Sequence, residues 1–492
     1  MIARAARRLP PALRQTLLYA LSIATAKAVS FVMVPVFTQF LTPEDYGRLD
    51  VLQTLADLLS VVIGLGLADC VYRFAGTEND PARMRRAAAS VFGLAMASGA
   101  IFLAAGQLAA PWVANLLPGG VQVSETRLIL ISLAASGLIL VPLAWLRLNG
   151  RAGTYALASG GRAVLQALLA TLLLSLGFGV AGVLLAGMIA CIALTTWMVV
   201  MQLRQTGLVL QGEDVRRHAA FGGPLVLAGA AAFVLGSCDR WFLAALDGTA
   251  AVAAYAVAVK FGLIVAMGAQ PFELWWQARR FPMLGGENGP RLVAASAWTG
   301  TVWVVLCGVG VAAVAPQLIR TMTPAAYHGA ADLVPWLSGI AVLHAVTGLL
   351  NVGIYSGRTG WDAFRVEGAV ALAALALYGL LIPRFGVEGA ISATALAQAG
   401  RMILVVGLAQ KRRPVPYPLR AIAVLLALGA AALAAIWMQS DWLAELAAGV
   451  TAALAITGFA LVAAPLPPAL AHLLSIRLPF LPGHLLAVDR RG

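Results

Sequence analysis

Long runs of apolar residues, each ended by charges, proline or glycine, follow one another along almost the whole chain. A helix needs about 20 apolar residues to cross a hydrocarbon layer ~30 Å thick. The runs divide into fourteen candidate spans, so the sequence predicts an all-α polytopic membrane protein with about 14 transmembrane helices. The predicted spans are 16–40, 49–71, 87–110, 127–147, 155–176, 181–203, 220–245, 250–274, 293–315, 332–356, 366–383, 388–409, 421–438 and 443–464.

The composition excludes a soluble enzyme and a disordered chain. Of the residues, 61% are hydrophobic and 11% charged, whereas a soluble domain carries roughly 25% charged residues. The net charge of +13 would suggest nucleic acid in a soluble protein, but these cations lie in short loops, so no nucleic-acid partner is expected. The four cysteines lie in apolar stretches without C-x-x-C spacing, which predicts buried hydrophobes and no metal site.

The distribution of Lys and Arg predicts the topology. Assigning the loops alternately to the two sides places 25 of these cations on the side of the N-terminus and 4 on the other. Cytoplasmic loops carry the excess of Lys and Arg, so both termini are predicted to be cytoplasmic and the number of spans even. The first apolar run is too long for a cleaved signal sequence, and we interpret it as an uncleaved span.

A weak internal repeat predicts the domain organisation. Shifting the sequence by 206 residues superposes the first two spans on the seventh and eighth. Six spans separate the halves, so both would run in the same direction, related by a pseudo-twofold axis along the membrane normal. We predict an N-terminal six-helix lobe over 1–212, a second six-helix lobe over 213–413, and a helix pair with a proline-rich cytoplasmic tail over 414–492.

Ionisable residues inside the spans indicate where function resides, because each costs about 2.5–3.5 kcal/mol at a helix centre. Five cations lie within spans, more than the clearly central acids. This excess predicts a cationic, water-filled cavity between the lobes for an anionic substrate. The alternative is internal ion pairing, such as Asp57 with Lys27 or Lys260, and Arg162 is close enough to the cytoplasmic face to snorkel. The candidate substrate-binding cations are Lys27, Arg240, Lys260 and Arg401, and the candidate charge-setting or ion-coupling acids are Asp50, Asp57 and Asp239.

Motifs for an enzyme are missing from the sequence. It contains no Gly-Lys-Ser/Thr phosphate loop, no G-x-S-x-G and no H-E-x-x-H. The largest outer loops, 111–126 and 316–331, hold a single acid, Glu125, which is too little for a membrane polymerase or ligase site. We therefore expect no enzyme and no cofactor. Trp275 and Trp276, near a span end, are expected at the membrane interface.

Several short motifs resemble those of one family. The segment 40–47 (FLTPEDYG) is similar to the short signature of bacterial polysaccharide-export flippases. Asp239-Arg240 with 254–260 resembles their seventh-to-eighth span region, and 356–359 with 381–390 resembles their C-terminal half. The resemblance implies membership in the multidrug, oligosaccharidyl-lipid and polysaccharide exporter superfamily, with two six-helix lobes around a central cavity.

The resemblance also implies a function. The expected activity is alternating-access translocation of an undecaprenyl-pyrophosphate-linked oligosaccharide across the bacterial inner membrane, for O-antigen or exopolysaccharide assembly. Expected partners are this lipid-linked substrate and membrane lipid, with a coupling cation or proton and polymerase machinery left open. The alternatives are a drug/cation antiporter of the same superfamily, a membrane polysaccharide polymerase or ligase, and peptidoglycan-precursor transport.

Overall fold

A computed structural model of the chain describes residues 11–64, 66–76, 78–210, 226–227, 229–286, 288–354 and 361–463. Every regular element in these ranges is helical. The backbone divides into two compact units, 1–253 and 254–492. The predicted lobe boundary at 212/213 falls outside the described residues and stays a prediction, as does the twofold relation. The predicted tail also lies outside them from residue 464 on.

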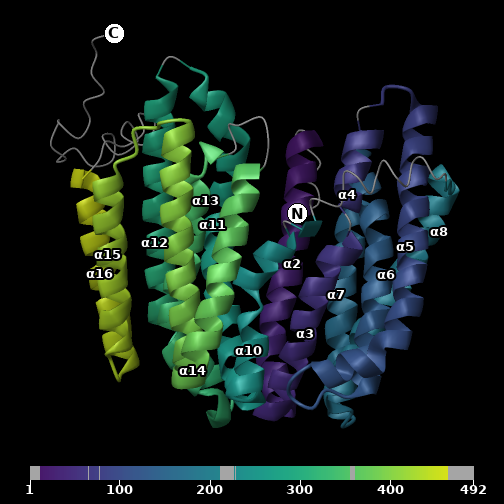
Figure 1. Cartoon of the computed structure of the whole chain (residues 1–492), viewed down its shortest axis with the longest axis horizontal. Helices are drawn as coiled ribbons and strands as arrows, with labels where there is room; N and C mark the ends of the chain where they lie inside the picture. Colours follow the sequence, from purple (N-terminus) through teal and green to yellow (C-terminus); the bar gives the residue numbers. More distant parts are fainter. Residues whose placement is uncertain are drawn as a thin grey trace, which may run out of the picture. The chain divides into compact units, whose positions relative to one another are not determined.

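The first unit is a bundle built mainly of long helices, and from α2 to α8 each follows the one before after a short connection (Figure 1). Its elements are α2 (Pro11–Phe40), α3 (Pro43–Gly64), α4 (Leu67–Cys70), the π-helix η1 (Val71–Ala75), α5 (Pro81–Leu116), α6 (Val123–Leu148), α7 (Ala152–Ser175), α8 (Gly179–Thr206) and α10 (Asp239–Leu246). α6 packs against α3, α5 and α8, and α7 packs against α2 and α8. These contacts bury small and aliphatic side chains of α6, such as Ala134 and Val141.

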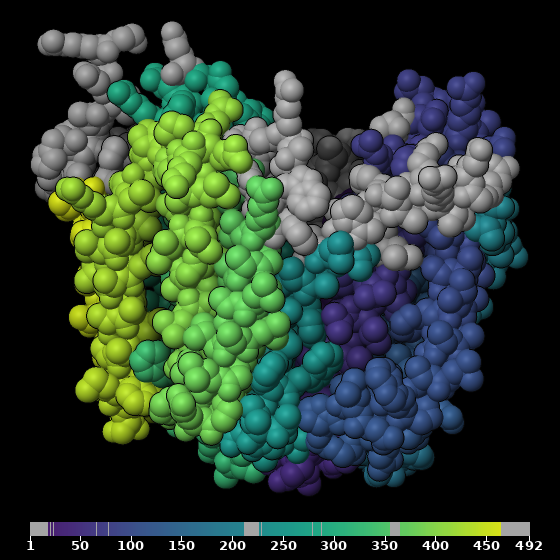
Figure 2. Space-filling model, in the orientation of Figure 1, coloured from purple at the N-terminus to yellow at the C-terminus, as the bar shows by residue number. Residues whose placement is uncertain are grey.

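The second unit is built around the antiparallel pair α12 and α13. Its elements are α11 (Thr249–Leu284, whose first turn belongs to the first unit), α12 (Gly289–Met322), η2 (Ala325–Tyr327), α13 (Gly329–Leu350), α14 (Trp361–Arg412), α15 (Leu419–Trp437) and α16 (Trp442–Ala463). α15 and α16 pack against α12, and Figure 2 shows them in yellow along one face. Leu454 and Val462 of α16 are 70% and 74% exposed, as lipid-facing side chains are expected to be.

α14 is a hairpin of two antiparallel helices. A straight helix of its 52 residues would be roughly 78 Å long, more than twice the hydrocarbon thickness. Gly386, with φ 53° and ψ −128°, breaks it at the middle. Beyond the break, Gly389 lies so close to Leu381 that an added Cβ would collide with the Leu381 carbonyl oxygen. The two halves therefore correspond to the predicted spans 366–383 and 388–409.

The described helices agree with a polytopic membrane protein, which confirms the predicted fold class. Eleven are long and apolar enough to cross a membrane, and the pair Gly229–Gly236 and Asp239–Leu246, bent by 45°, makes twelve if it is counted as one span. That count treats the two helices of the α14 hairpin as one span. It also omits α2, whose apolar part, Ala24–Phe40, is shorter than the length required. The number is thus compatible with fourteen.

The turn of the α14 hairpin gives a first prediction. At Gly386 the φ and ψ angles suit glycine alone, so Gly386→Ala should lower the free energy of unfolding by about 1–3 kcal/mol. Thermal unfolding of the purified protein measures this loss. The matched control is Gly379→Ala, because Gly379 is helical and nothing lies within 4 Å of its added Cβ. Equal melting temperatures for the two variants would contradict the hairpin.

Candidate functional site

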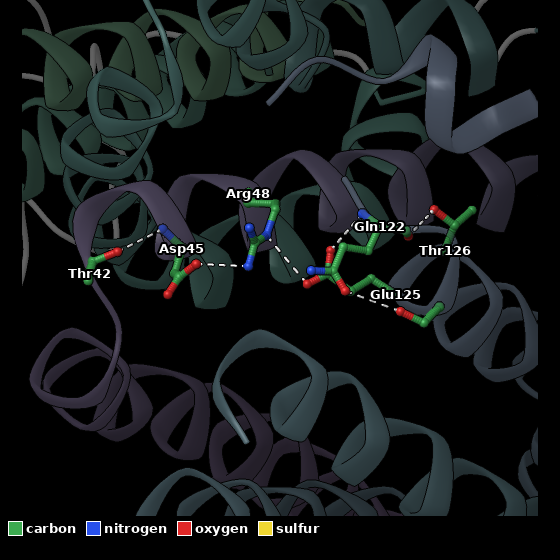
Figure 3. A network of polar contacts seen from close by, with 7 residues as sticks. Thr42, Asp45, Arg48, Gln122, Glu125 and Thr126 are labelled. Carbon is green, nitrogen blue, oxygen red and sulfur yellow. Dashed lines mark hydrogen bonds and ion pairs between the residues drawn. The ribbon is translucent and has the colours of Figure 1, made fainter. Parts of the chain in front are cut away.

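The 40–47 motif forms the turn between α2 and α3 (Figure 3). The Thr42 hydroxyl accepts a hydrogen bond from the Asp45 backbone N–H at 3.2 Å, which caps α3. Arg48 pairs with Asp45 at 2.8 Å and with Glu125 of α6 at 3.4 Å. Glu125 in turn accepts from the backbone N–H of Gln122, completing a capping box. The motif therefore has a structural role: it caps α3, and its Asp45 holds Arg48, which joins α3 to α6.

A bent helix pair in the first unit brings three predicted site residues together. The helix Gly229–Gly236 ends at a turn, and α10 begins at Asp239. Arg240 Nε lies 3.1 Å from Asp50 Oδ2, and the two side chains are only 12% and 10% exposed. Ser237 in the turn donates to Asp57 Oδ2 at 3.3 Å. We call Asp50, Asp57, Ser237 and Arg240 the Arg240 cluster.

The positions of these residues follow from helix geometry. Asp50 and Asp57 are seven residues apart on α3, hence on one face, and that face packs against α10. The Trp241 indole N–H donates to the Val51 carbonyl at 3.2 Å and fixes the register of the two helices. Asp239 is 4% exposed and accepts from the Arg240 backbone N–H at the start of α10, where the helix dipole favours an acid.

The two predicted lysines lie on long helices. Lys27 is half-buried on α2, and no hydrogen bond or ion pair to it is found among the described residues. The pairing of Lys27 with Asp57, considered from the sequence, is therefore not seen. Lys260 is half-buried on α11 in the second unit.

The fourth predicted cation, Arg401, lines a polar cavity in the second unit. The cavity has a volume of about 330 Å³, and we call it the α11–α13 cavity. Arg280 crosses one side of it and donates to Asn351 Oδ1 at 2.7 Å. The lining residues are Glu273, Trp276, Gln277 and Arg280 of α11, His344, Ala345, Gly348 and Leu349 of α13, Asn351, and Arg401 of α14.

Arg401 is held by a carboxylate across the α14 hairpin. Its Nε lies 3.0 Å from both oxygens of Glu367 and its Nη2 2.6 Å from Oε1. The fork-shaped guanidinium suits such a two-oxygen contact. Next to this pair, His344 Nδ1 lies 3.5 Å from the Gln398 amide nitrogen. The positive charge of Arg401, which lines the cavity, is therefore balanced by the Glu367 carboxylate.

Part of this cavity is not predicted from the sequence, which ends the span at 274. The apolar span runs to Gln277 and α11 continues to Leu284, and Trp276, expected at the membrane interface, is buried within the protein with 1% of its surface exposed. The sequence does carry an indication of this wall of the cavity: the spacing of Glu273, Trp276, Gln277 and Arg280 places them on one face of a helix. Glu273 and Glu367 also add two acids inside helices, so the predicted excess of buried cations shrinks.

The side chains of these two sites can bind a polar ligand. Within the described ranges, no group of three or more His, Cys, Asp or Glu side chains is placed to hold a metal ion. Guanidinium, carboxylate, imidazole and amide groups inside apolar helices can replace the hydration shell of a polar ligand. The arrangement suits binding and release.

Solved structures of other proteins share the fold of this chain. The chain resembles the lipid II flippase MurJ in an inward closed conformation with a TM-score of 0.70 at 11% identity, covering 90% of this chain and 98% of that one. An inward-facing multidrug resistance MATE family transporter of the MOP superfamily gives 0.61 at 14% identity, covering 80% and 98%. A MOP superfamily transporter from Pyrococcus furiosus gives 0.51 at 15% identity, covering 82% and 95%. No curated protein matches the sequence.

The family itself is identified from the sequence. The family model described as polysaccharide biosynthesis protein matches residues 12–273, more than half of the chain. That range includes the 40–47 motif and the whole Arg240 cluster. The chain therefore belongs to the polysaccharide biosynthesis protein family, as the motifs predicted, with the multi-helical fold of the MOP superfamily transporters.

Proposed function

We propose that the protein is a flippase that moves an undecaprenyl-pyrophosphate-linked oligosaccharide across the bacterial inner membrane, for O-antigen or exopolysaccharide assembly, by alternating access. The observation that carries the proposal is the set of ionisable side chains inside membrane helices of a polysaccharide biosynthesis protein. Charges at membrane depth are costly and mark substrate or ion pathways. The similarity to a lipid II flippase supports a lipid-linked substrate.

The physical problem that such a flippase solves is the polar head of its substrate. Pyrophosphate and sugars cannot cross hydrocarbon unaided, whereas the polyprenyl tail can remain in lipid. In this proposal Lys27, Arg240, Lys260 and Arg401 provide positive charge for the head. The acids Asp50, Asp57 and Asp239 set that charge or bind a coupling ion. Both termini are cytoplasmic, since the Lys and Arg count favours that side.

A second candidate function is a drug/cation antiporter of the same superfamily. Two carboxylates favour it, because neither Asp57 nor Glu273 has an ion pair among the described residues. Such acids can bind a cation or a proton. The similarity to MATE transporters shows the shared fold alone.

Deleting the gene in its own host separates the candidate functions. The flippase proposal predicts loss of one surface glycan, with lipid-linked units accumulating on the cytoplasmic leaflet. The measurement is the leaflet distribution of these units, read with an enzyme or lectin that reaches only the outer side. Intact glycan with increased drug susceptibility would contradict the proposal in favour of the antiporter, and accumulation on the periplasmic leaflet would favour a polymerase or ligase.

A further inference from the structure

We propose that the α11–α13 cavity binds a sugar ring of the substrate, and that the pyrophosphate binds elsewhere. This inference rests on the proposed function and deepens it by dividing the head of the substrate between two kinds of site. It is drawn from the charge, the hydrogen-bonding groups and the size of the cavity.

The charges that line the cavity are close to balance. Arg401 is engaged by both oxygens of Glu367, and Arg280 shares the lining with Glu273. A pyrophosphate carries several negative charges and would lie against the Glu273 carboxylate here, at a cost that low dielectric makes large. A net-neutral ligand meets no such penalty. Lys27, with no described anionic partner, is the better candidate for the pyrophosphate.

The polar groups of the cavity match the hydroxyls of a sugar, which both donate and accept hydrogen bonds. Gln277 and Asn351 offer amides, which also do both, and Glu273 offers an acceptor. The strongest single indication is Trp276: it is 1% exposed, and its indole N–H has no acceptor among the described residues. A buried hydrogen-bond donor without an acceptor is costly. The nitrogen has almost no exposed surface, so a ligand hydroxyl or acetamido oxygen would satisfy it by displacing the side chains that cover it.

The size of the cavity limits the ligand to a small part of an oligosaccharide. Its volume of about 330 Å³ is room for one sugar ring with a substituent and too little for a whole oligosaccharide. It lies at the lower end of the range for small-molecule pockets. The cavity is therefore expected to bind one ring of the glycan, with or without an N-acetyl group.

The experiment uses the full-length protein in lipid nanodiscs and two probes, the N-acetylglucosamine disaccharide and inorganic pyrophosphate. Trp276→Phe keeps an aromatic side chain but removes the indole N–H, and should weaken disaccharide binding about five- to tenfold by calorimetric titration. Pyrophosphate affinity should stay unchanged. The matched control is Trp275→Phe, the neighbouring tryptophan on α11, which is 43% exposed and outside the lining. It should bind both probes as the wild type does.

A second variant protects the test from misfolding. Gln277→Ala alters an exposed residue of the same lining and should also weaken the disaccharide alone. The inference is wrong if the wild type does not bind the disaccharide, or if neither variant changes that binding. The proposed function still stands in either case, provided that pyrophosphate binding and glycan export persist. If pyrophosphate binding and glycan export are missing as well, both are overturned.

Discussion

Asp50→Ala should destabilise the protein by about 3–5 kcal/mol, because it leaves the Arg240 guanidinium buried without its carboxylate. The measurement is the midpoint of thermal or denaturant unfolding of the purified protein, together with its abundance in the membrane. Arg240→Ala should lower stability by a similar amount. The paired variant Asp50→Asn with Arg240→Gln removes both charges and should recover most of the loss.

The control for this prediction is a surface ion pair of the same unit. Arg83 and Asp80 are 78% and 53% exposed and 3.9 Å apart, and such pairs contribute about 0–1 kcal/mol. Arg83→Ala should therefore leave stability almost unchanged. If Asp50→Ala cost no more than Arg83→Ala, the Arg240 cluster would not be a buried ion pair.

Lys27→Ala should abolish glycan export while the protein stays at normal abundance in the membrane. Lys27 has no anionic partner among the described residues, so its removal leaves no orphaned carboxylate there and acts on the ligand. Lys27→Arg should retain part of the activity, since the charge remains. The measurement is surface glycan per cell at matched protein levels, with a loss of more than about tenfold expected, the size of one charged contact.

Lys411→Ala is the matched control for Lys27→Ala. It removes the same side chain from an exposed position near the end of α14, where a cation is solvated, and should leave export unchanged. Wild-type export by Lys27→Ala would remove this lysine from the proposed substrate site.

The spans were predictable because their length and apolarity are local properties of the chain. The breaks were less visible: the apolar run 220–245 does not show that the helix turns between Gly236 and Asp239. α11 runs past the predicted end at 274 because Pro271 is accommodated within it and the polar residues that follow face a cavity. From hydropathy alone, those polar residues would be assigned to a loop.

The partners of the buried charges were not predictable in the same way. The sequence places Asp50 and Asp57 on one helix face, but the element that meets this face depends on tertiary packing. Within the first unit Asp57 contacts Ser237 and not Lys27, and Arg240 pairs with Asp50. Likewise, the family motif at 40–47 marks a structural turn, so this motif indicated the family without indicating the site.

The central claim is that this protein moves a lipid-linked glycan between leaflets, and reconstitution tests it most directly. Purified protein is inserted into liposomes that carry an undecaprenyl-pyrophosphate oligosaccharide, and the fraction of its sugar reached by an added, membrane-impermeant glycosidase is followed over time. We predict that the wild type exposes the inner pool to the enzyme and that the Lys27→Ala variant leaves it protected. An inner pool that stays protected with folded wild-type protein, with or without an ion gradient, would contradict the account.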